Sequence, residues 1–309
     1  MKKILLATTA VALSATVAAA EVKLSGDARF GIQYDGAKAD NKTVLEKRLR
    51  FNLDASTTTD AGVTLGGRIR ITSQEEFGVA GGADSGSRVN GARLFAQYQG
   101  LTVAVGNILG AIESFPGLYT TNVGMTGLGY YDNLGAGPWD AYTSAGKGAE
   151  GVEVIYKAGP LSAHLSYSSD DFSNSYVGDS ETLAAHVAYV YEGWTFGLAA
   201  QEAKNNTKSD LILASVQGAF GDFGVTFVGG KASASAATEK ETFLMLGGNY
   251  TVGATKITGY VADWDNVYAN AAFGLGAAYN LGGGASLVGG VVRTPAKDTR
   301  ADLGVSFRF

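Results

Sequence analysis

Five arginines carry the most distinctive chemistry of this 309-residue chain. They occupy alternate positions of three runs in which apolar and polar residues alternate, and they are Arg29, Arg48, Arg50, Arg68 and Arg70. Side chains at alternate positions of a β-strand share one face, so the five guanidinium groups are expected on a common surface. Arginine stays charged at any physiological pH, and its planar group can be held by several hydrogen bonds. The spacing predicts a positively charged wall, against the alternative of a solvated face with incidental bases.

The relative positions of these arginines depend on the turn between the second and third runs. If that turn is symmetric about Thr59, Arg48 lies opposite Arg70. By the same symmetry Arg50 lies opposite Arg68. Like charges directly opposite each other on adjacent strands are destabilising. A sequence that keeps facing arginines despite this repulsion must use their charge for a function. A positively charged wall in a water-filled pore would be such a function.

Acidic groups that could face this wall lie in the long segment 107–149, which carries Glu113, Asp132 and Asp140 among many aromatic residues. Structureless loops of this length are uncommon in compact domains. An external loop has little reason to be so apolar, so we expect the segment to fold inward and bury its rings. Its carboxylates, Glu113 and Asp132 above all, would then face the arginines. Opposed charges across a passage act as a filter for ions and dipolar solutes.

The composition argues against most other chemistry. The chain has no cysteine, which excludes disulfides, thiolate zinc sites and cysteine nucleophiles. Its two histidines, His164 and His186, are too few for a multi-histidine metal site and are interpreted as solvated wall residues. Ser162 and Ser166 share the face of His164, but no nucleophile-elbow motif accompanies them. We therefore expect no enzyme and no cofactor, and a net charge of −5 argues against nucleic-acid binding.

A metal site stays unassigned at this stage. The loop carboxylates Asp170, Asp171 and Asp179 could bind divalent cations, or they could form a solvated rim.

Alternation with a period of two is the dominant pattern, as in residues 23–34, 48–53, 64–71, 161–167 and 303–309. It predicts β-strands with one apolar and one polar face, in either a soluble sandwich or a membrane barrel. The connections decide between them, because seven short ones alternate strictly with eight long ones and so delimit sixteen strands. Short turns on one rim and long loops on the other are typical of bacterial outer-membrane barrels. The expected fold is all-β: a 16-stranded antiparallel transmembrane β-barrel whose long third loop folds into the lumen.

Aromatic residues support the membrane interpretation. Six of the seven short turns are entered just after an aromatic residue in the apolar phase: Tyr98, Tyr156, Tyr191, Phe220, Tyr250 and Tyr279. Rings at one common height on the apolar face are typical of the girdle at a membrane interface.

The N-terminal segment predicts export. Lys2 and Lys3 precede a short apolar run that ends in three alanines at residues 18–20, the pattern of a cleaved secretory signal peptide. We expect cleavage after Ala20 and a single barrel domain over residues 21–309.

Several stretches resemble one family: residues 23–34 (KLSGDARFGIQY), 48–52 (RLRFN), 60–70 (DAGVTLGGRIR), 101–107 (LTVAVGN), 248–260 (GNYTVGATKITGY) and 302–309 (DLGVSFRF). The chain resembles the general diffusion porins of Gram-negative bacteria, especially the sixteen-stranded alphaproteobacterial type. The resemblance implies a homotrimer in the outer membrane, reached through the periplasm and surrounded by lipid and lipopolysaccharide. It implies that the C-terminal Phe309 is read by the barrel assembly machinery.

The same resemblance implies passive diffusion of small hydrophilic solutes and ions, without a cofactor. The five arginines fall where that family keeps its basic cluster. The alternative is a substrate-selective outer-membrane channel, specific for a sugar or an ion.

Overall fold

The computed structural model describes residues 20–75, 87–132, 150–172, 180–205, 207–234 and 241–309. The predicted signal peptide therefore lies outside the described residues, apart from Ala20. One short 3₁₀ helix, η1 (Asp170–Phe172), accompanies the strands in these ranges. The strands are β1 (Glu21–Asp35), β2 (Thr43–Thr58), β3 (Thr64–Glu75), β4 (Ser87–Val89), β5 (Arg93–Tyr98), β6 (Leu101–Gly106), β7 (Glu150–Ala158), β8 (Leu161–Ser169), β9 (Glu181–Tyr191), β10 (Trp194–Asn205), β11 (Thr207–Phe220), β12 (Phe223–Ala234), β13 (Glu241–Val252), β14 (Thr255–Asp265), β15 (Ala272–Gly282), β16 (Ala285–Arg293) and β17 (Thr299–Arg308).

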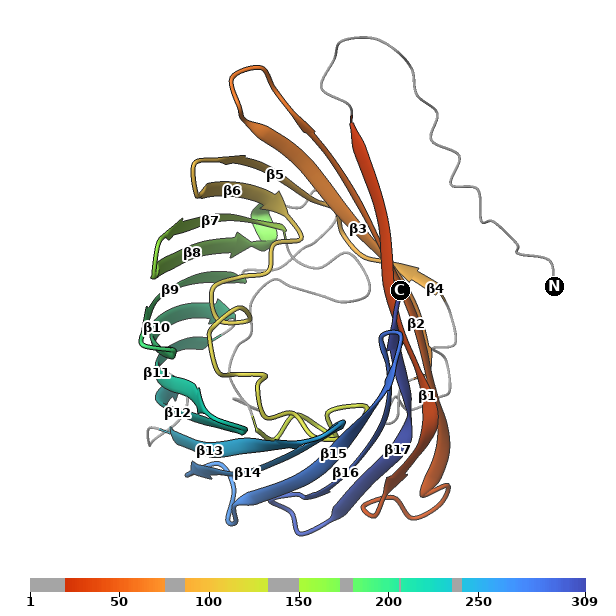
Figure 1. Cartoon of the computed structure of the whole chain (residues 1–309). Coiled ribbons are helices and arrows are strands. Elements are labelled where there is room, and N and C mark those ends of the chain that lie inside the picture. The colour runs from red at the N-terminus through yellow and green to blue at the C-terminus, as the bar shows by residue number, and fades with distance from the viewer. Residues whose placement is uncertain (1–19, 76–86, 133–149, 173–179, 206, 235–240) are drawn as a thin grey trace, which may run out of the picture.

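These strands form one antiparallel sheet that closes into a barrel, because β1 pairs with both β2 and β17 (Figure 1). The short strands β4 and β5 both pair with β3 and are separated only by residues 90–92. They are two pieces of one wall strand, so the seventeen strands form a sixteen-stranded wall. The predicted fold class and strand number are confirmed.

The outer surface of the barrel is apolar, as the period-two pattern predicts. On β9, the exposed Leu183 and Val187 alternate with the buried Ala184, His186 and Ala188. Side chains of one parity therefore face outward along the strand, and those of the other face the lumen. An outward apolar band of this kind suits a bilayer.

Aromatic rings gather on this outer face beside the short turns. Phe220 and Phe223 flank one turn and stack with their centroids 5.9 Å apart. Phe223 also stacks on Tyr250 of the next strand at 4.5 Å. No helix among the described residues is long and apolar enough to cross a membrane.

The turn between β2 and β3 differs from the one that symmetry about Thr59 predicts. Thr59 closes it by accepting from Gly62 and donating to the carbonyl of Val63, both at 2.8 Å. Gly62 has a φ of 80°, which favours glycine. The centre of the turn therefore lies two residues later than predicted.

The register of the two strands shifts accordingly. Arg48 lies opposite Gln74 rather than Arg70, and Arg50 lies opposite Thr72 rather than Arg68. The predicted pairs of facing arginines on β2 and β3 are wrong.

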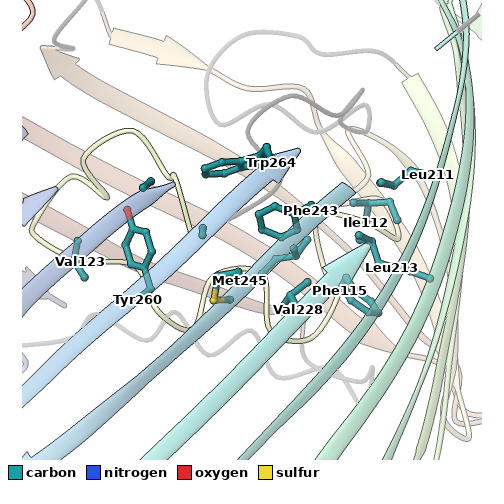
Figure 2. Packing of buried hydrophobic residues seen from close by; sticks show 14 of the residues in the cluster. Ile112, Phe115, Val123, Leu211, Leu213, Val228, Phe243, Met245, Tyr260 and Trp264 are labelled. Carbon is teal, nitrogen blue, oxygen red and sulfur yellow. The ribbon is translucent and has the colours of Figure 1, made fainter. Parts of the chain in front are cut away.

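The apolar core of the described residues lies inside the barrel, between the wall and the long connection from β6 to β7. We call this connection, residues 107–149, loop 3; the structure describes it as far as Asp132. Its side chains Ile112, Phe115 and Val123 pack against inward residues such as Leu213 and Met245 (Figure 2). The apolar side chains of loop 3 thus pack against the inner wall of the barrel, as the composition of the loop predicts.

Glycines on the inner wall let the loop approach the sheet backbone. A Cβ on Gly290 would lie 2.5 Å from the backbone nitrogen of Gly124 in loop 3. A Cβ on Gly276 would lie 3.0 Å from the same nitrogen. Only glycine leaves room for such close contact.

Candidate functional site

The first turn of loop 3 is bound to strands β7, β8 and β9. Gly110 donates its backbone N–H to Glu153 Oε2 at 3.3 Å, and the N–H of Ala111 bonds to Ser166 Oγ at 2.9 Å. His186 Nδ1 donates to the carbonyl of Ala111 at 2.7 Å. The start of the loop is therefore attached to three consecutive strands.

Farther along, at Met125 and Thr126, the loop is bound to the strands where the barrel closes. Asp302 of β17 accepts from the N–H of Met125 at 2.9 Å and from the N–H and hydroxyl of Thr126 at 2.7 and 2.8 Å. Arg29 Nη1 of β1 donates to the carbonyl of Met125 at 3.3 Å. Loop 3 thus follows the inner wall from β7 round to β1, and Figure 1 shows it along the wall opposite β2 and β3.

The side of the lumen across from this loop carries the arginines. Arg48 and Arg50 lie on β2, and Arg68 and Arg70 lie on β3. All five arginines are at inward positions, but their environments differ: the side chain of Arg29 is 12% exposed and that of Arg68 is 47% exposed. Arg29 belongs partly to the attachment of loop 3. The side chains of Arg48 and Arg50 on β2 are 17% and 14% exposed, so the wall is most open at Arg68 on β3.

Carboxylates on the same strands hold these arginines in place. Arg48 Nη2 lies 2.5 Å from Asp27 Oδ1, and Arg50 Nη1 lies 3.8 Å from Asp27 Oδ2. Arg29 pairs with Glu46 at 2.7 Å. One carboxylate thus serves two guanidinium groups, which explains how like charges share the patch.

Each arginine of β3 bonds to the residue that lies directly opposite it on β2. Arg68 Nε donates to Asp54 Oδ1 at 2.5 Å, and Arg70 Nε donates to Asn52 Oδ1 at 2.9 Å. The five arginines and the three acids described leave a net charge of about +2 on the patch at neutral pH.

The acids of this wall were not predicted as site residues. Asp27 lies two positions before Arg29, and Glu46 lies two positions before Arg48, in the same inward phase. That shared phase is the sequence signal that would have identified them.

Glu113 lies on loop 3, with its side chain partly buried. Its Oε2 accepts a hydrogen bond from the hydroxyl of Tyr119 at 2.6 Å. Burial raises the pKa of Glu113 above that of an ordinary glutamate, although the hydrogen bond from Tyr119 opposes the shift. Glu113 therefore becomes protonated at a higher pH than an ordinary glutamate does.

Asp132 lies on the wall side of loop 3, with 0% of its surface exposed. Its Oδ2 accepts from Thr121 Oγ1 at 3.0 Å, and the Asn122 amide, with its nitrogen turned toward it, lies 2.7 Å from both oxygens. Burial raises the pKa of Asp132 to about 7. The Asp132 carboxylate is thus enclosed and bound by Thr121 and Asn122 of loop 3, while Asp140 lies outside the described residues.

The two histidines are buried beneath loop 3, with 4% of His164 and 8% of His186 exposed. Their interpretation as solvated wall residues is wrong, because the loop covers them. His164 Nε2 lies 2.9 Å from Glu153 Oε2, and its Nδ1 lies 2.7 Å from Ser114 Oγ. Ser166 bonds to the loop backbone instead. No group of three or more potential ligands that could hold a metal ion occurs within the described ranges, which include Asp170 and Asp171 but not Asp179.

Comparison with known proteins decides the family. A model of the Gram-negative porins matches residues 7–299. The chain belongs to the Gram-negative porin family. Porins of Fuscovulum blasticum and Rhodobacter capsulatus are each 31% identical to this porin, over 303 and 322 residues, and each match covers 94% of this chain and 100% of the relative.

Solved structures agree with this result. A triple mutant of Rhodopseudomonas blastica porin superposes on this porin with a TM-score of 0.81 at 28% identity, and the match covers 94% of this chain and 100% of that one. Family and closed barrel together place this porin in the bacterial outer membrane as a channel. Its relatives are channel proteins rather than enzymes.

Proposed function

We propose that this porin is a passive diffusion channel for small hydrophilic solutes and ions, with its constriction between loop 3 and the arginines of β1–β3. The observation that carries the proposal is the course of loop 3, which is attached to β7, β8 and β9 at its start and to β17 and β1 at Met125. Solutes therefore have to pass between the loop and the wall of β2 and β3.

The charges explain how such a passage would discriminate. The arginine patch keeps a net positive charge, and among the described residues of loop 3 we assign Glu113 as the acidic group on the loop side. A dipolar solute or a water molecule would align between them, and an ion would meet a fixed field in a narrow space. Such a filter needs no cofactor and no energy source.

We also propose the surroundings that the family resemblance implies. The mature domain would span residues 21–309 and form a homotrimer in contact with lipid and lipopolysaccharide. Phe309 would serve recognition by the barrel assembly machinery; it closes the wall through paired backbone hydrogen bonds with Gly26.

The experiment that tests the function is reconstitution of the purified protein. In planar bilayers we expect conductance that rises in proportion to bulk salt. In liposome swelling we expect uptake of neutral sugars to fall with molecular mass and not to saturate. A folded protein that conducts no ions and admits no sugar would refute the proposal.

A substrate-selective channel is the second candidate, and one observation favours it. Tyr119 and Tyr130 of loop 3 are 37% and 40% exposed and lie edge to face with ring centroids 6.2 Å apart. Exposed rings on a loop inside the lumen could stack on the apolar face of a sugar. Block of ion current by a sugar at saturable, millimolar concentration, lost in Tyr119→Ala, would favour this candidate over free diffusion.

A further inference from the structure

A polar hollow lies in the lumen between loop 3 and the rim of short turns. Its volume is about 440 Å³, and it is lined by Thr120 of loop 3, by Gly193 of the turn before β10 and by residues of strands β10 to β14. The short turns of outer-membrane barrels face the periplasm, so the hollow lies on the periplasmic side of loop 3. Its volume is in the range of pockets that hold small molecules.

Polar side chains of neighbouring strands point into this hollow. Thr195, Gln217 and Thr226 lie opposite one another across β10, β11 and β12. Asn249 of β13 is paired with Gly224 of β12, and a Cβ on that glycine would lie 2.6 Å from the amide nitrogen of Asn249. The amide therefore lies over Gly224, where the missing side chain leaves it room.

Loop 3 closes one side of the hollow. Thr120 Oγ1 lies 3.0 Å from Thr226 Oγ1 and 3.1 Å from the carbonyl of Gly117. A carbonyl only accepts, so the Thr120 hydroxyl donates to Gly117 and can accept from Thr226. The site thus consists of a wall of the barrel and a loop that is hydrogen-bonded to that wall.

Lys256 of β14 supplies a positive charge to the hollow. It shares the inward phase of the buried Tyr260 and Trp264, and it is exposed to the lumen. Within the ranges that the structure describes, its ammonium group forms no ion pair, and no carboxylate lines the hollow. The charge of Lys256 is therefore available to a solute.

This set of groups favours one class of solute. An ammonium group only donates, which suits an oxyanion, whereas amides and hydroxyls both donate and accept, which suits the hydroxyl groups of a solute. No aromatic ring is found among the described residues that line the hollow, so a neutral sugar ring has nothing to stack on there. A carboxylate that also carries hydroxyl groups matches the lining better than a neutral sugar does.

We propose that this hollow is a low-affinity binding site for small hydroxylated carboxylate anions. Lys256 binds the carboxylate, and Gln217 and Asn249 bind hydroxyl groups of the solute. The site rests on the proposed function, because a solute from the loop-side mouth reaches it only through the constriction. An anion that has passed the arginines then meets a second positive group near the periplasmic rim.

The test is the block of single-channel current by gluconate in about 0.1 M potassium chloride, where free charges are screened beyond about 10 Å. Gluconate added on the periplasmic side should reduce the current saturably, at millimolar concentration. Sorbitol has an alcohol where gluconate has its carboxylate, and acetate has the carboxylate without the hydroxyls, so each should block far less. Sorbitol that blocks as well as gluconate would overturn the proposal.

Two variants separate the roles of the charge and the amides. Lys256→Gln should raise the half-blocking concentration of gluconate roughly fivefold, the scale of one charge-assisted hydrogen bond that is partly exposed. Gln217→Ala removes no charge and should raise it roughly threefold, the scale of one neutral hydrogen bond, without changing the conductance in potassium chloride. Block by gluconate that is the same in wild type and Lys256→Gln would overturn the proposal.

Lys157→Gln is the matched control for the charge. Lys157 is an exposed lysine on the inward phase of β7, one residue before the end of that strand at a short turn, and it does not line the hollow. This variant should be blocked by gluconate as the wild type is. An equal loss of block in Lys157→Gln and Lys256→Gln would reduce the effect to the overall charge of the pore and overturn the site.

Nuclear magnetic resonance provides a readout that does not need ion flow. The side-chain amide signals of Gln217 and Asn249 should shift saturably with gluconate in the wild type and much less in Lys256→Gln. Signals that do not move with gluconate in the wild type would overturn the site. Loss of conductance with these shifts retained would instead contradict the proposed channel function.

Discussion

Arg48 and Asp27 form an ion pair across β1 and β2, with Nη2 2.5 Å from Oδ1. Their backbones are not directly opposite, since Asp27 pairs with Arg50 and Arg48 pairs with Arg29. The carboxylate therefore reaches diagonally and lies between two guanidinium groups, with Arg50 at 3.8 Å. The positive wall depends on this embedded acid, which reduces the repulsion within the patch.

Asp27→Asn should make the channel more selective for anions. Removing one negative charge should raise the chloride-to-potassium permeability ratio roughly threefold, since a unit charge at about 6 Å in water is worth about 0.7 kcal/mol. The reversal potential in a potassium chloride gradient measures this ratio. Asp54→Asn makes the same charge change beside the half-exposed Arg68 and should shift the ratio less. A ratio that is unchanged in Asp27→Asn, or that moves toward cations, would show that Asp27 does not tune the field.

Acid should also increase anion selectivity, through Glu113. Burial raises the pKa of Glu113, so its negative charge is lost at a higher pH than for an ordinary glutamate, while the arginines stay charged. Reversal potentials measured between about pH 7 and 4 should therefore move toward the chloride potential in the wild type. Glu113→Gln should show the acidic value throughout. The prediction fails if both proteins respond to pH in the same way.

Asp132→Asn should stabilise loop 3 at neutral and alkaline pH. The pKa of Asp132 is raised from 3.8 to about 7 by burial, so the folded loop binds the proton more tightly than the unfolded chain does. Stability from the protonated form is complete below about pH 4 and is lost as the pH rises toward 7. At pH 8, amides of residues 107–132 should be protected by up to about 4 kcal/mol more in the variant than in the wild type. Weaker protection in the variant would mean that Thr121 and Asn122 stabilise the ionised carboxylate.

Gly290→Ala should narrow the passage. The added Cβ would lie 2.5 Å from the backbone nitrogen of Gly124, so loop 3 must move off the wall into the lumen. Overpacking of this kind costs about 1–3 kcal/mol and should appear as reduced single-channel conductance. Gly259→Ala is the matched control on the outer face, where the nearest atom lies 3.4 Å from the new Cβ. Equal conductance in the two variants would contradict the packing that we describe for the loop.

The barrel itself could be predicted from the sequence because a period of two leaves few alternatives. Residues such as Leu183 and Val187 alternate with polar or small partners, and turn lengths separate the two rims. The inward phase of the arginines followed from the same pattern. The register between β2 and β3 did not, because it depends on the conformation of one turn, where Gly62 takes a positive φ.

The details of the site lay beyond sequence reasoning for a related reason. Whether a residue of loop 3 faces the lumen or the wall depends on which strand the loop touches at that point. Asp132 therefore turned out to be buried, and His164 and His186 turned out to be covered rather than solvated. The long-range contacts of the loop, such as Met125 with Asp302, join residues far apart in the sequence and leave no local pattern.

The most direct test of the arginine wall is the reversal potential of Arg48→Gln combined with Arg50→Gln in a potassium chloride gradient. Lys208→Gln with Lys231→Gln is the matched control, since both lysines are exposed on the outward phase of β11 and β12. The arginine variant should shift the permeability ratio roughly tenfold toward potassium, at about 0.7 kcal/mol per charge, and should conduct more. The lysine variant should keep the wild-type values. An arginine variant with the reversal potential and conductance of the wild type would contradict the account.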